Sequence, residues 1–360
     1  MREQKRSQRN TGSRKKNKNI FKRLAHWYRH HKKETLYSLA LCLAAVVLLV
    51  FLAVKEQKHQ KSLEVSAENG HDTGNSYREL DYEGRHYKYN SMIKMVLYAG
   101  VDGDGTMKAS KQYGNKERAD VISLFVIDKL HKKMSVIPIN RDTITDIRKY
   151  TLSGNDDGLY KTHIGYAYSY GDGGKVSCEN LCEAVTNMLG GIPVREYVVT
   201  NQDSMPYLSN LIGEVTVTVP NADLEALYPE FTEGSQVTLD AQNITPFLQY
   251  RNTDEEFSNE GRMERQKVYM LAYIQKLQQM EIDELTDMWK SVEELESHLQ
   301  TSISRNEYLE LVQLLDEVEF SEENFEVLEG EDRQGKLHDE FHLDEKALKE
   351  KIIELFYEEN

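Results

Sequence analysis

Three short apolar runs, each bounded by charged or polar residues, constrain the fold of this chain more than any other feature of its sequence. The runs cover residues 92–101, 121–127 and 134–139 and are rich in Val, Ile, Leu and Phe. Runs of this length and composition, bounded by Gly, Asp and Asn, are typical of buried strands rather than of helices. The sequence therefore predicts three neighbouring strands in a buried sheet.

Acidic and basic residues stand where these runs begin or end. They are Asp102 after the first run, Arg118 and Asp120 before the second, and Arg141 and Asp142 after the third. In an α/β sheet, ligands bind where strand ends and their loops meet. Mg²⁺ takes one or two carboxylates and leaves its other positions to water and phosphate oxygens. We therefore expect Asp102 and Asp120 to bind Mg²⁺ or Mn²⁺ beside a phosphate, with solvated loop charges as the alternative.

The middle of the chain alternates helix and strand patterns. An apolar spacing of three and four residues predicts a helix over residues 175–189. Strands are expected at residues 196–201 and 214–219, and a short helix capped by Asp203 between them, over residues 203–211. This alternation predicts an α/β sheet covered by helices.

A second group of basic residues falls at the predicted start of a helix over residues 261–280. The group consists of Arg251, Arg262, Arg265 and Gln266, with Arg251 delivered by an expected helix near residues 240–250. Arg262 and Gln266 share one helix face. A helix N-terminus favours anions, and arginine grips phosphate oxygens in a fork. The pattern predicts a polyanion site, and a solvated face in which Glu264 pairs with an arginine is the alternative.

Residues 36–54 carry no charge over 19 positions. As a helix they would span ~28 Å, which is close to the hydrocarbon thickness of a bilayer. Residues 1–34 hold 13 basic and two acidic residues, so this segment has a net charge of +11 and the remainder −26. We interpret residues 35–55 as a single transmembrane helix behind a cytoplasmic basic tail. A cleaved signal peptide is the alternative, but its apolar region is usually shorter and no clean cleavage site follows.

The region after the expected membrane helix divides into a stalk and a domain. Residues 56–89 are polar and lack apolar periodicity, which is typical of a stalk. Residues 90–360 are expected to form an extracytoplasmic domain. The basic tail beside a membrane helix indicates orientation and contact with anionic lipid rather than a nucleic-acid site.

The chain resembles the LytR-CpsA-Psr family of cell-envelope proteins from about Ser91 to its C-terminus. The matching segments, in order, are Gly100-Val101-Asp102, Arg118-Ala119-Asp120, Arg141-Asp142-Thr143, Lys161 through Tyr168, Tyr197 through Asn201, Leu211 through Val217, and Arg251 followed by Gly261-Arg262 and Arg265-Gln266. Their order behind an N-terminal anchor makes the resemblance specific.

The resemblance implies a fold and an activity. The fold would be an α-β-α arrangement with a central mixed sheet and helices on both faces. The activity would be that of a phosphotransferase in the membrane of a Gram-positive bacterium. Such an enzyme moves a glycopolymer from an undecaprenyl-pyrophosphate carrier onto peptidoglycan and leaves it attached through a phosphodiester. A pyrophosphatase side activity would accompany it. The polyprenyl tail would lie in an apolar groove, and no nucleic acid is expected as a partner. Such a reaction needs positioning and charge neutralisation above all.

The resemblance also implies roles for individual residues. Asp102 and Asp120 would hold the metal against the pyrophosphate. The residues implied to bind the pyrophosphate are Arg118, Arg141, Lys161, Arg251, Arg262, Arg265 and Gln266. Those implied in catalysis are Arg118, Arg141, Asp142 and Arg251. Either Asp120 or Asp142 would take the proton of the acceptor hydroxyl, and the sequence does not choose between them.

Four positions depart from the family pattern. Asn140 replaces a usual proline, Gln249 a usual arginine, Asn259 a common acidic residue and His163 a common asparagine. Losing one arginine would cost about 1.5–3 kcal/mol of charge-assisted binding. Two further functions therefore stay open. One is a non-catalytic relative that binds the carrier lipid or the wall. The other is a membrane-tethered regulator whose residues 1–34 bind nucleic acid.

The charge asymmetry generates a topology prediction. Alkaline phosphatase fused after residue 200 should be active, because it would be exported, whereas a fusion after residue 30 should be inactive. Enzyme activity in intact cells, corrected for the amount of each fusion protein, measures this. An inactive fusion after residue 200 would place the domain in the cytoplasm and contradict the assignment.

Overall fold

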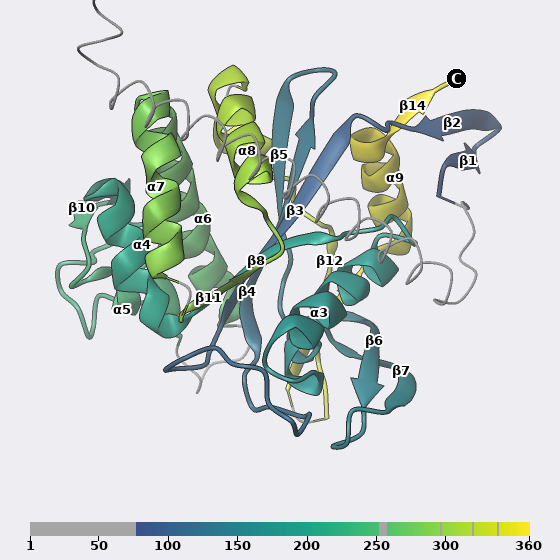
Figure 1. Cartoon of the computed structure of the whole chain (residues 1–360), viewed down its shortest axis with the longest axis horizontal. Helices are drawn as coiled ribbons and strands as arrows, with labels where there is room; N and C mark the ends of the chain where they lie inside the picture. The colour runs from purple at the N-terminus through teal and green to yellow at the C-terminus, as the bar shows by residue number, and fades with distance from the viewer. Residues whose placement is uncertain (1–76, 252–257, 296, 319, 337) are drawn as a thin grey trace, which may run out of the picture. The chain divides into compact units, whose positions relative to one another are not determined.

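The computed structural model describes residues 77–251, 258–295, 297–318, 320–336 and 338–360 (Figure 1). These residues belong to one unit that runs from Asn75 to Asn360. The expected cytoplasmic tail and transmembrane helix, residues 1–55, lie outside the described ranges. Within those ranges, no helix is both long enough and apolar enough to cross a membrane.

A five-stranded mixed sheet forms the centre of the unit. Its strands, in spatial order, are β11 (Leu299–Thr301), β8 (Glu196–Asn201), β3 (Ile93–Val101), β4 (Ala119–Asp128) and β5 (Lys133–Pro138). Strands β3 and β8 run parallel, and the other neighbouring pairs are antiparallel. The three apolar runs therefore form adjacent strands, and the predicted mixed sheet is confirmed.

Helices flank this sheet along the chain. They are α3 (Lys175–Met188), α4 (Met205–Ile212), α5 (Ile244–Gln249), α6 (Asn259–Gln278), α7 (Ile282–Glu294), α8 (Arg305–Glu317) and α9 (Glu345–Phe356). The predicted helix at residues 175–189 matches α3. The helix predicted at 261–280 begins two residues earlier, and the one predicted near 240–250 is shorter than expected.

Successive side chains of the central strands point to opposite faces of the sheet, as the pleat requires. On one face, Leu97 and Leu124 are fully buried in a core that also contains residues of α3 and α9. On the other face, Met134 and Val136 pack with residues of α6 and α8. Both faces are covered (Figure 1), which explains why the central strands are apolar on both sides.

Asp203 does not cap α4, contrary to the sequence prediction. Residues Gln202–Ser204 form a 3-10 turn before the helix, and the turn has no side-chain cap. The Asp203 carboxylate instead accepts a hydrogen bond from the Gly105 amide at 2.8 Å. It therefore ties α4 to the loop after β3. Because α4 has a proline in its first turn, one of the amides that a cap would serve is missing.

The strand predicted at residues 214–219 forms, but outside the central sheet. It is β9 (Val215–Thr218), and it pairs only with β10 (Gln236–Leu239) in an antiparallel two-stranded sheet. Val215 and Val217 face a separate core built with α4, α5 and α6. The other side of β9 is exposed, which is the pattern of an antiparallel sheet with one wet face.

Part of the expected stalk belongs to the folded unit. Strands β1 (Glu79–Tyr82) and β2 (Arg85–Tyr89) form a three-stranded sheet with β14 (Tyr357–Glu359) near the C-terminus. The Tyr357 hydroxyl also donates to the Tyr77 carbonyl at 2.6 Å. Residues 79–89 were assigned to the stalk because they are polar, and the pairing of β2 with β14, far away in sequence, overrides that local signal.

Two further hairpins lie beside the end of the central sheet that carries the charged residues. They are β6 (Ile144–Tyr150) with β7 (Asp156–His163), and β12 (Gly330–Gln334) with β13 (Asp339–Leu343). A backbone hydrogen bond from Phe341 to the Asp142 carbonyl, 2.9 Å long, attaches the second hairpin to the segment after β5.

The two-sided burial of the sheet generates a stability prediction. Leu97→Ala should lower the free energy of unfolding by about 2–5 kcal/mol, because Leu97 is fully buried and the cavity stays partly unfilled. Leu130→Ala is the matched control, since Leu130 is 54% exposed and its loss should change stability by less than about 0.5 kcal/mol. Urea unfolding measures both variants, and equal losses would contradict the assigned core.

Candidate functional site

Charged side chains from four segments meet at one end of the central sheet. Asp102 follows β3, Asp120 lies at the start of β4, Arg141 follows β5, and Arg262 lies in the first turns of α6. Because β4 runs antiparallel to both β3 and β5, its start lies beside the ends of these two strands. The sheet topology thus brings together residues that are far apart in the sequence. We refer to Asp102, Arg118, Asp120, Arg141 and Arg262 as the charged cluster.

Asp120 is the centre of the charged cluster. Arg141 Nη1 donates to its Oδ1, and Arg262 Nη1 donates to its Oδ2 at 2.9 Å. The side chain of Arg262 is only 4% exposed, and those of Arg141 and Asp120 are 16% and 24% exposed. Two guanidiniums share the Asp120 carboxylate, and the Asp142 carboxylate lies 3.5 Å from Arg141 Nε, so this part of the cluster is close to neutral.

Burial and neighbouring positive charges both affect the pKa of Arg262. Burial lowers the pKa of its guanidinium, and the charges of Arg141 and Arg251 lower it further, while Asp120 opposes them. Arg251 therefore lies close to the charged cluster. Buried cations of the same sign repel one another, and an anionic ligand would relieve that repulsion.

Asp102 and Arg118 form the outer side of the cluster. The Arg118 amide donates to Asp102 Oδ1 at 2.5 Å. Desolvation by the surrounding protein raises the pKa of the Asp102 carboxyl, although Asp102 as a whole is exposed. The Arg118 amide opposes this rise, and the charge of Asp120 adds to it. The Arg118 guanidinium lies over the ring of Tyr166, 4.7 Å from its centroid.

The two aspartates suit a hard divalent cation only in part. In the described ranges, no group of three or more His, Cys, Asp or Glu side chains could hold a metal. Asp102 and Asp120 are close enough for the charge of Asp120 to raise the pKa of Asp102. Two neighbouring carboxylates fit an ion that keeps water and substrate phosphate as its other ligands. The donor set thus fits Mg²⁺ or Mn²⁺ bound together with a phosphate, and does not form a complete protein cage.

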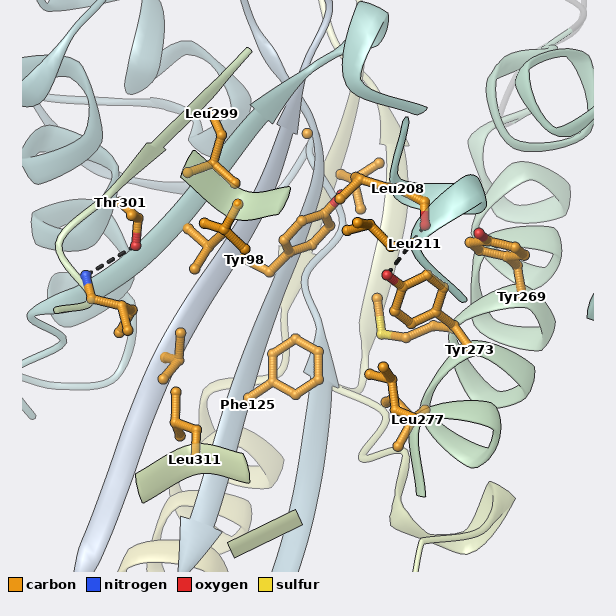
Figure 2. Close-up of a pocket in the computed structure, with 18 of the residues that line it drawn as sticks. Tyr98, Phe125, Leu208, Leu211, Tyr269, Tyr273, Leu277, Leu299, Thr301 and Leu311 are labelled. Carbon is orange, nitrogen blue, oxygen red and sulfur yellow. Dashed lines mark hydrogen bonds between the residues drawn. The ribbon is translucent and has the colours of Figure 1, made fainter. Parts of the chain in front are cut away.

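A cavity of about 590 Å³ opens from the charged cluster into the layer between the sheet and α6. Asp102, Asp120, Arg262 and Gln266 line one part of it. The remaining lining is almost entirely apolar or aromatic. Figure 2 shows Tyr98 and Phe125 on the side of the sheet and Tyr273 and Leu277 on the side of α6. Such a cavity, polar at one end and apolar beyond it, fits an amphiphile with a charged head and a long apolar tail.

One tyrosine in the cavity wall has an unused hydroxyl. Tyr269 lies on α6 one turn after Gln266 and is 9% exposed. Its hydroxyl is buried and has no hydrogen-bond partner among the described residues. The neighbouring Tyr273 hydroxyl, by contrast, donates to the Leu208 carbonyl at 3.3 Å (Figure 2). A buried unpaired hydroxyl costs free energy unless a ligand oxygen pairs with it.

Two of the residues predicted to bind pyrophosphate make their contacts with residues outside the charged cluster. Arg265 is fully buried, and its donors go to the Phe247 and Tyr250 carbonyls, Asn221 and Asp223. These four partners come from α5, the residue after it and the segment after β9, and they hold Arg265 apart from Asp120, which binds Arg262. Lys161 is exposed on β7, in register with Asp146. Among the described residues, no hydrogen bond or ion pair joins either of them to the charged cluster.

The other predicted residues lie in or beside the cluster. Arg141 Nε approaches Asp142 Oδ1 at 3.5 Å, which places Asp142 next to the arginines. Gln266 lines the cavity and donates to the Leu248 carbonyl at 3.1 Å. The structure thus brings together eight of the predicted residues: Asp102, Arg118, Asp120, Arg141, Asp142, Arg251, Arg262 and Gln266.

Two departures from the family pattern contact each other. Asn259 Nδ2 donates to Asn140 Oδ1 at 2.9 Å, and Asn259 Oδ1 accepts from Arg262 Nη2 at 2.6 Å. The amide pair thus orients Arg262 without adding a negative charge. Gln249 lines the cavity. His163 Nε2 lies 2.8 Å from the Asp339 carbonyl oxygen, within hydrogen-bonding distance.

Acidic side chains form a rim beside the charged cluster that the sequence does not reveal. Burial raises the pKa of Asp332 to about 6, together with the charge and hydrogen bond of Glu260 and the charges of Asp142 and Asp339. These residues come from α6, the loop after β5 and the β12–β13 hairpin. Only the tertiary fold joins them. The resemblance implied an apolar groove without naming the residues that line it. Val96 and Tyr98, which make the second face of β3 apolar, are among them.

Comparison with known proteins decides the family. The model of the LytR_cpsA_psr family matches residues 51–355. The chain belongs to this family. One curated relative is TagV of Bacillus subtilis (strain 168), named as a polyisoprenyl-teichoic acid–peptidoglycan teichoic acid transferase. It is 25% identical to this chain over 285 residues, which cover 76% of this chain and 66% of TagV.

A second curated protein and several solved structures also resemble this chain. An uncharacterised protein of Staphylococcus aureus (strain NCTC 8325 / PS 47) is 24% identical over 50% of this chain and 41% of its own length. The chain thus spans slightly less than two thirds of TagV and under half of this second relative. The TagV crystal structure matches with a TM-score of 0.55 at 24% identity, over 73% of this chain and 96% of that one. TagT bound to LIIa-WTA matches with a TM-score of 0.54 at 20% identity, over 74% and 90%.

The acidic rim generates a pH prediction. The folded state binds a proton at Asp332 up to about pH 6, whereas the unfolded chain loses it near pH 3.8. The contribution of Asp332 to stability therefore falls as the pH rises from about 4 to about 6. The difference in unfolding free energy between Asp332→Asn and the wild type should therefore shift in favour of the variant by roughly 1–2 kcal/mol between pH 4 and pH 7. The full pKa shift would correspond to ~3 kcal/mol, but solvent screens part of it.

Urea unfolding at pH 4 and pH 7 measures this difference. Asp316→Asn, exposed on α8, is the matched control and should show no such gain. A constant difference between Asp332→Asn and the wild type at both pH values would contradict the assigned proton.

Proposed function

We propose that this LytR-CpsA-Psr protein is a phosphotransferase that moves a glycopolymer from a polyprenyl-pyrophosphate carrier onto peptidoglycan. The observation that carries the proposal is the position of the charged cluster at the polar part of the 590 Å³ cavity. A lipid pyrophosphate has the same division into a dianionic or more highly charged head and an apolar tail. The name of TagV, which transfers teichoic acid from a polyisoprenyl carrier to peptidoglycan, supports the same chemistry.

The charged cluster supplies what phosphoryl transfer needs most. Arg141 and Arg262 are held on Asp120 at fixed positions, and their guanidiniums would donate to a pyrophosphate without having to move. An apolar tail that fills the cavity next to them would displace water, so each charge interaction would be stronger there than in solvent. Arg118 and Arg251 would bind the outer phosphate oxygens. When bound at Asp102 and Asp120, Mg²⁺ or Mn²⁺ would add charge neutralisation at the same phosphates.

The reaction balances without a further reactant. The acceptor hydroxyl oxygen forms a bond to the phosphorus that carries the glycopolymer, the P–O–P bond breaks, and polyprenyl phosphate leaves. The hydroxyl proton passes to a carboxylate. Asp142 suits this step better than Asp120, because both oxygens of Asp120 already accept bonds from arginines. Water in place of the acceptor hydroxyl would give the pyrophosphatase side reaction.

The proposal includes an anchor and a compartment. Residues 35–55 would hold the protein in the cell membrane, with residues 1–34 in the cytoplasm and the domain outside, where both the carrier lipid and peptidoglycan are available. The polar residues between the anchor and β1 would serve as the stalk. A net charge of −26 outside the basic tail makes the arginine cluster a local exception in an acidic chain.

Transfer in vitro tests the proposal. The full-length chain, a lipid-linked saccharide pyrophosphate, peptidoglycan and Mg²⁺ should yield a phosphodiester product and free polyprenyl phosphate. Arg141→Ala should lower the rate about 10- to 150-fold, the equivalent of losing about 1.5–3 kcal/mol of charge-assisted binding. Arg305→Ala, exposed at the start of α8, is the matched control and should leave the rate unchanged.

Two outcomes would overturn this function. One is the absence of transfer by a folded wild type with Mg²⁺ present, combined with carrier binding that survives Arg141→Ala; this is the behaviour of a non-catalytic relative. The other is transfer that Asp120→Ala leaves intact, because the charged cluster would then have no part in the reaction.

A further inference from the structure

Aromatic rings and cations alternate along a surface that begins at the charged cluster. The Arg118 guanidinium lies 4.7 Å from the centroid of the Tyr166 ring, and the Tyr166 and Tyr170 ring centroids are 6.5 Å apart. Lys149 Nζ lies 5.8 Å from the Tyr170 ring and 5.0 Å from the Tyr160 ring. We call Tyr160, Lys149, Tyr170 and Tyr166 the aromatic strip. Its steps are short enough to form one continuous surface from Arg118 outward.

The aromatic strip and the cavity leave the charged cluster on different faces of the sheet. The strip is carried by the β6–β7 hairpin and the two 3-10 turns that follow it, Ile164–Tyr166 and Tyr168–Tyr170. Ile147 and Ile164 in these segments are fully buried in the core on the α3 face. The cavity lies on the opposite face, beneath α6 and α8. A ligand that places its apolar tail in the cavity therefore leaves the strip open for another part of the same reaction.

The side chains of the strip are available to a ligand. Tyr160 is 44% exposed, and Lys149, Tyr166 and Tyr170 are partly exposed. A saccharide fits this surface, because sugar rings have apolar C–H faces that pack on aromatic rings, and phenol hydroxyls can bond their hydroxyls. Lys149, between two rings, would pair with an anionic substituent. Such cations are informative in a chain with a net charge of −15.

We propose that the aromatic strip is a subsite for a saccharide chain that carries anionic groups, and that it guides this chain to the charged cluster. The inference rests on the proposed function and deepens it, because it assigns the saccharide side of the same site. Two sources share this chemistry: the glycopolymer of the donor and the glycan strand of the peptidoglycan acceptor. Since the strip begins at Arg118, either one would bring its reacting group to the phosphates.

The chain contains a matched control for the chemistry of the strip. Lys349 Nζ lies 5.1 Å from the Tyr82 ring, in a cation–π pair between α9 and β1. This pair resembles Lys149 and Tyr160 in geometry but lies in the β1–β2–β14 sheet region, apart from the charged cluster. If lysine–tyrosine pairs only stabilise hairpins, the two pairs should behave alike. If the strip binds saccharide, only Tyr160 and Lys149 should matter.

Binding measurements on the full-length chain in detergent test the subsite. The acceptor probe is a soluble glycan strand released from peptidoglycan by a muramidase. The donor probes are a short-chain prenyl pyrophosphate with and without a disaccharide. We expect Tyr160→Ala and Lys149→Gln each to weaken one saccharide probe about tenfold, and to leave the sugar-free prenyl pyrophosphate unchanged. Loss of the glycan strand assigns the strip to the acceptor, and loss restricted to the disaccharide pyrophosphate assigns it to the donor.

Further arms keep the outcome decisive. Tyr160→Leu retains apolar bulk without an aromatic face, so it should bind as weakly as Tyr160→Ala while keeping the wild-type unfolding midpoint. Tyr82→Ala should bind every probe like the wild type. The subsite is overturned if all variants bind all probes equally, if Tyr82→Ala loses as much as Tyr160→Ala, or if the strip variants lose only binding to anionic lipid vesicles, which would make it a membrane contact.

The test separates this inference from the proposed function because binding is measured without turnover. Transfer that is indifferent to Tyr160→Ala and Lys149→Gln, with unchanged saccharide binding, overturns the subsite alone. Saccharide binding that depends on the strip in a chain that transfers nothing overturns the phosphotransferase and leaves the subsite.

Discussion

The pairing of two arginines with one aspartate is the interaction on which the rest of the site depends. Arg262 is 4% exposed, and a buried guanidinium without a partner would be strongly destabilising. Asp120 is that partner, and its other carboxylate oxygen accepts a hydrogen bond from Arg141. This pairing compensates the burial of Arg262 and holds both guanidiniums where the apolar cavity begins. The low polarity of that cavity strengthens any charge interaction made beside it.

The antiparallel order β3-β4-β5 explains why this cluster exists. It places the end of β3, the start of β4 and the end of β5 at one edge, and α6 begins at the same edge. The sheet then separates the two faces. The cavity occupies the α6 face, and the β6–β7 hairpin with its aromatic strip covers the α3 face. The charged cluster is therefore open to approach from two faces of the sheet, as the proposed transfer requires.

Two of the four departures from the family pattern are coupled in the structure. Asn140 and Asn259 hydrogen-bond to each other, and Asn259 also accepts from Arg262. An acidic residue at position 259 would cancel part of the charge of Arg262, whereas the amide holds the same geometry and leaves the charge available. This gain opposes the loss of an arginine at position 249. The two changes leave the net charge of the site as it is in the family pattern, and the charged cluster remains assembled.

Local sequence patterns determined a large part of this protein. The apolar runs bounded by Asp and Arg located β3, β4 and β5 and the residues at their ends, because strand length, alternation and charge are local properties. The patterns failed wherever long-range pairing decided. Residues 79–89 form strands because β14 pairs with them, and Asp203 binds Gly105 rather than its own helix. Tertiary structure alone separated Arg262 from Arg265, since helix position decides which of two similar arginines meets the cavity and which is buried against carbonyls. It also decided the cavity, the acidic rim and the aromatic strip, because each is made by segments whose sequences carry no mark of their partners.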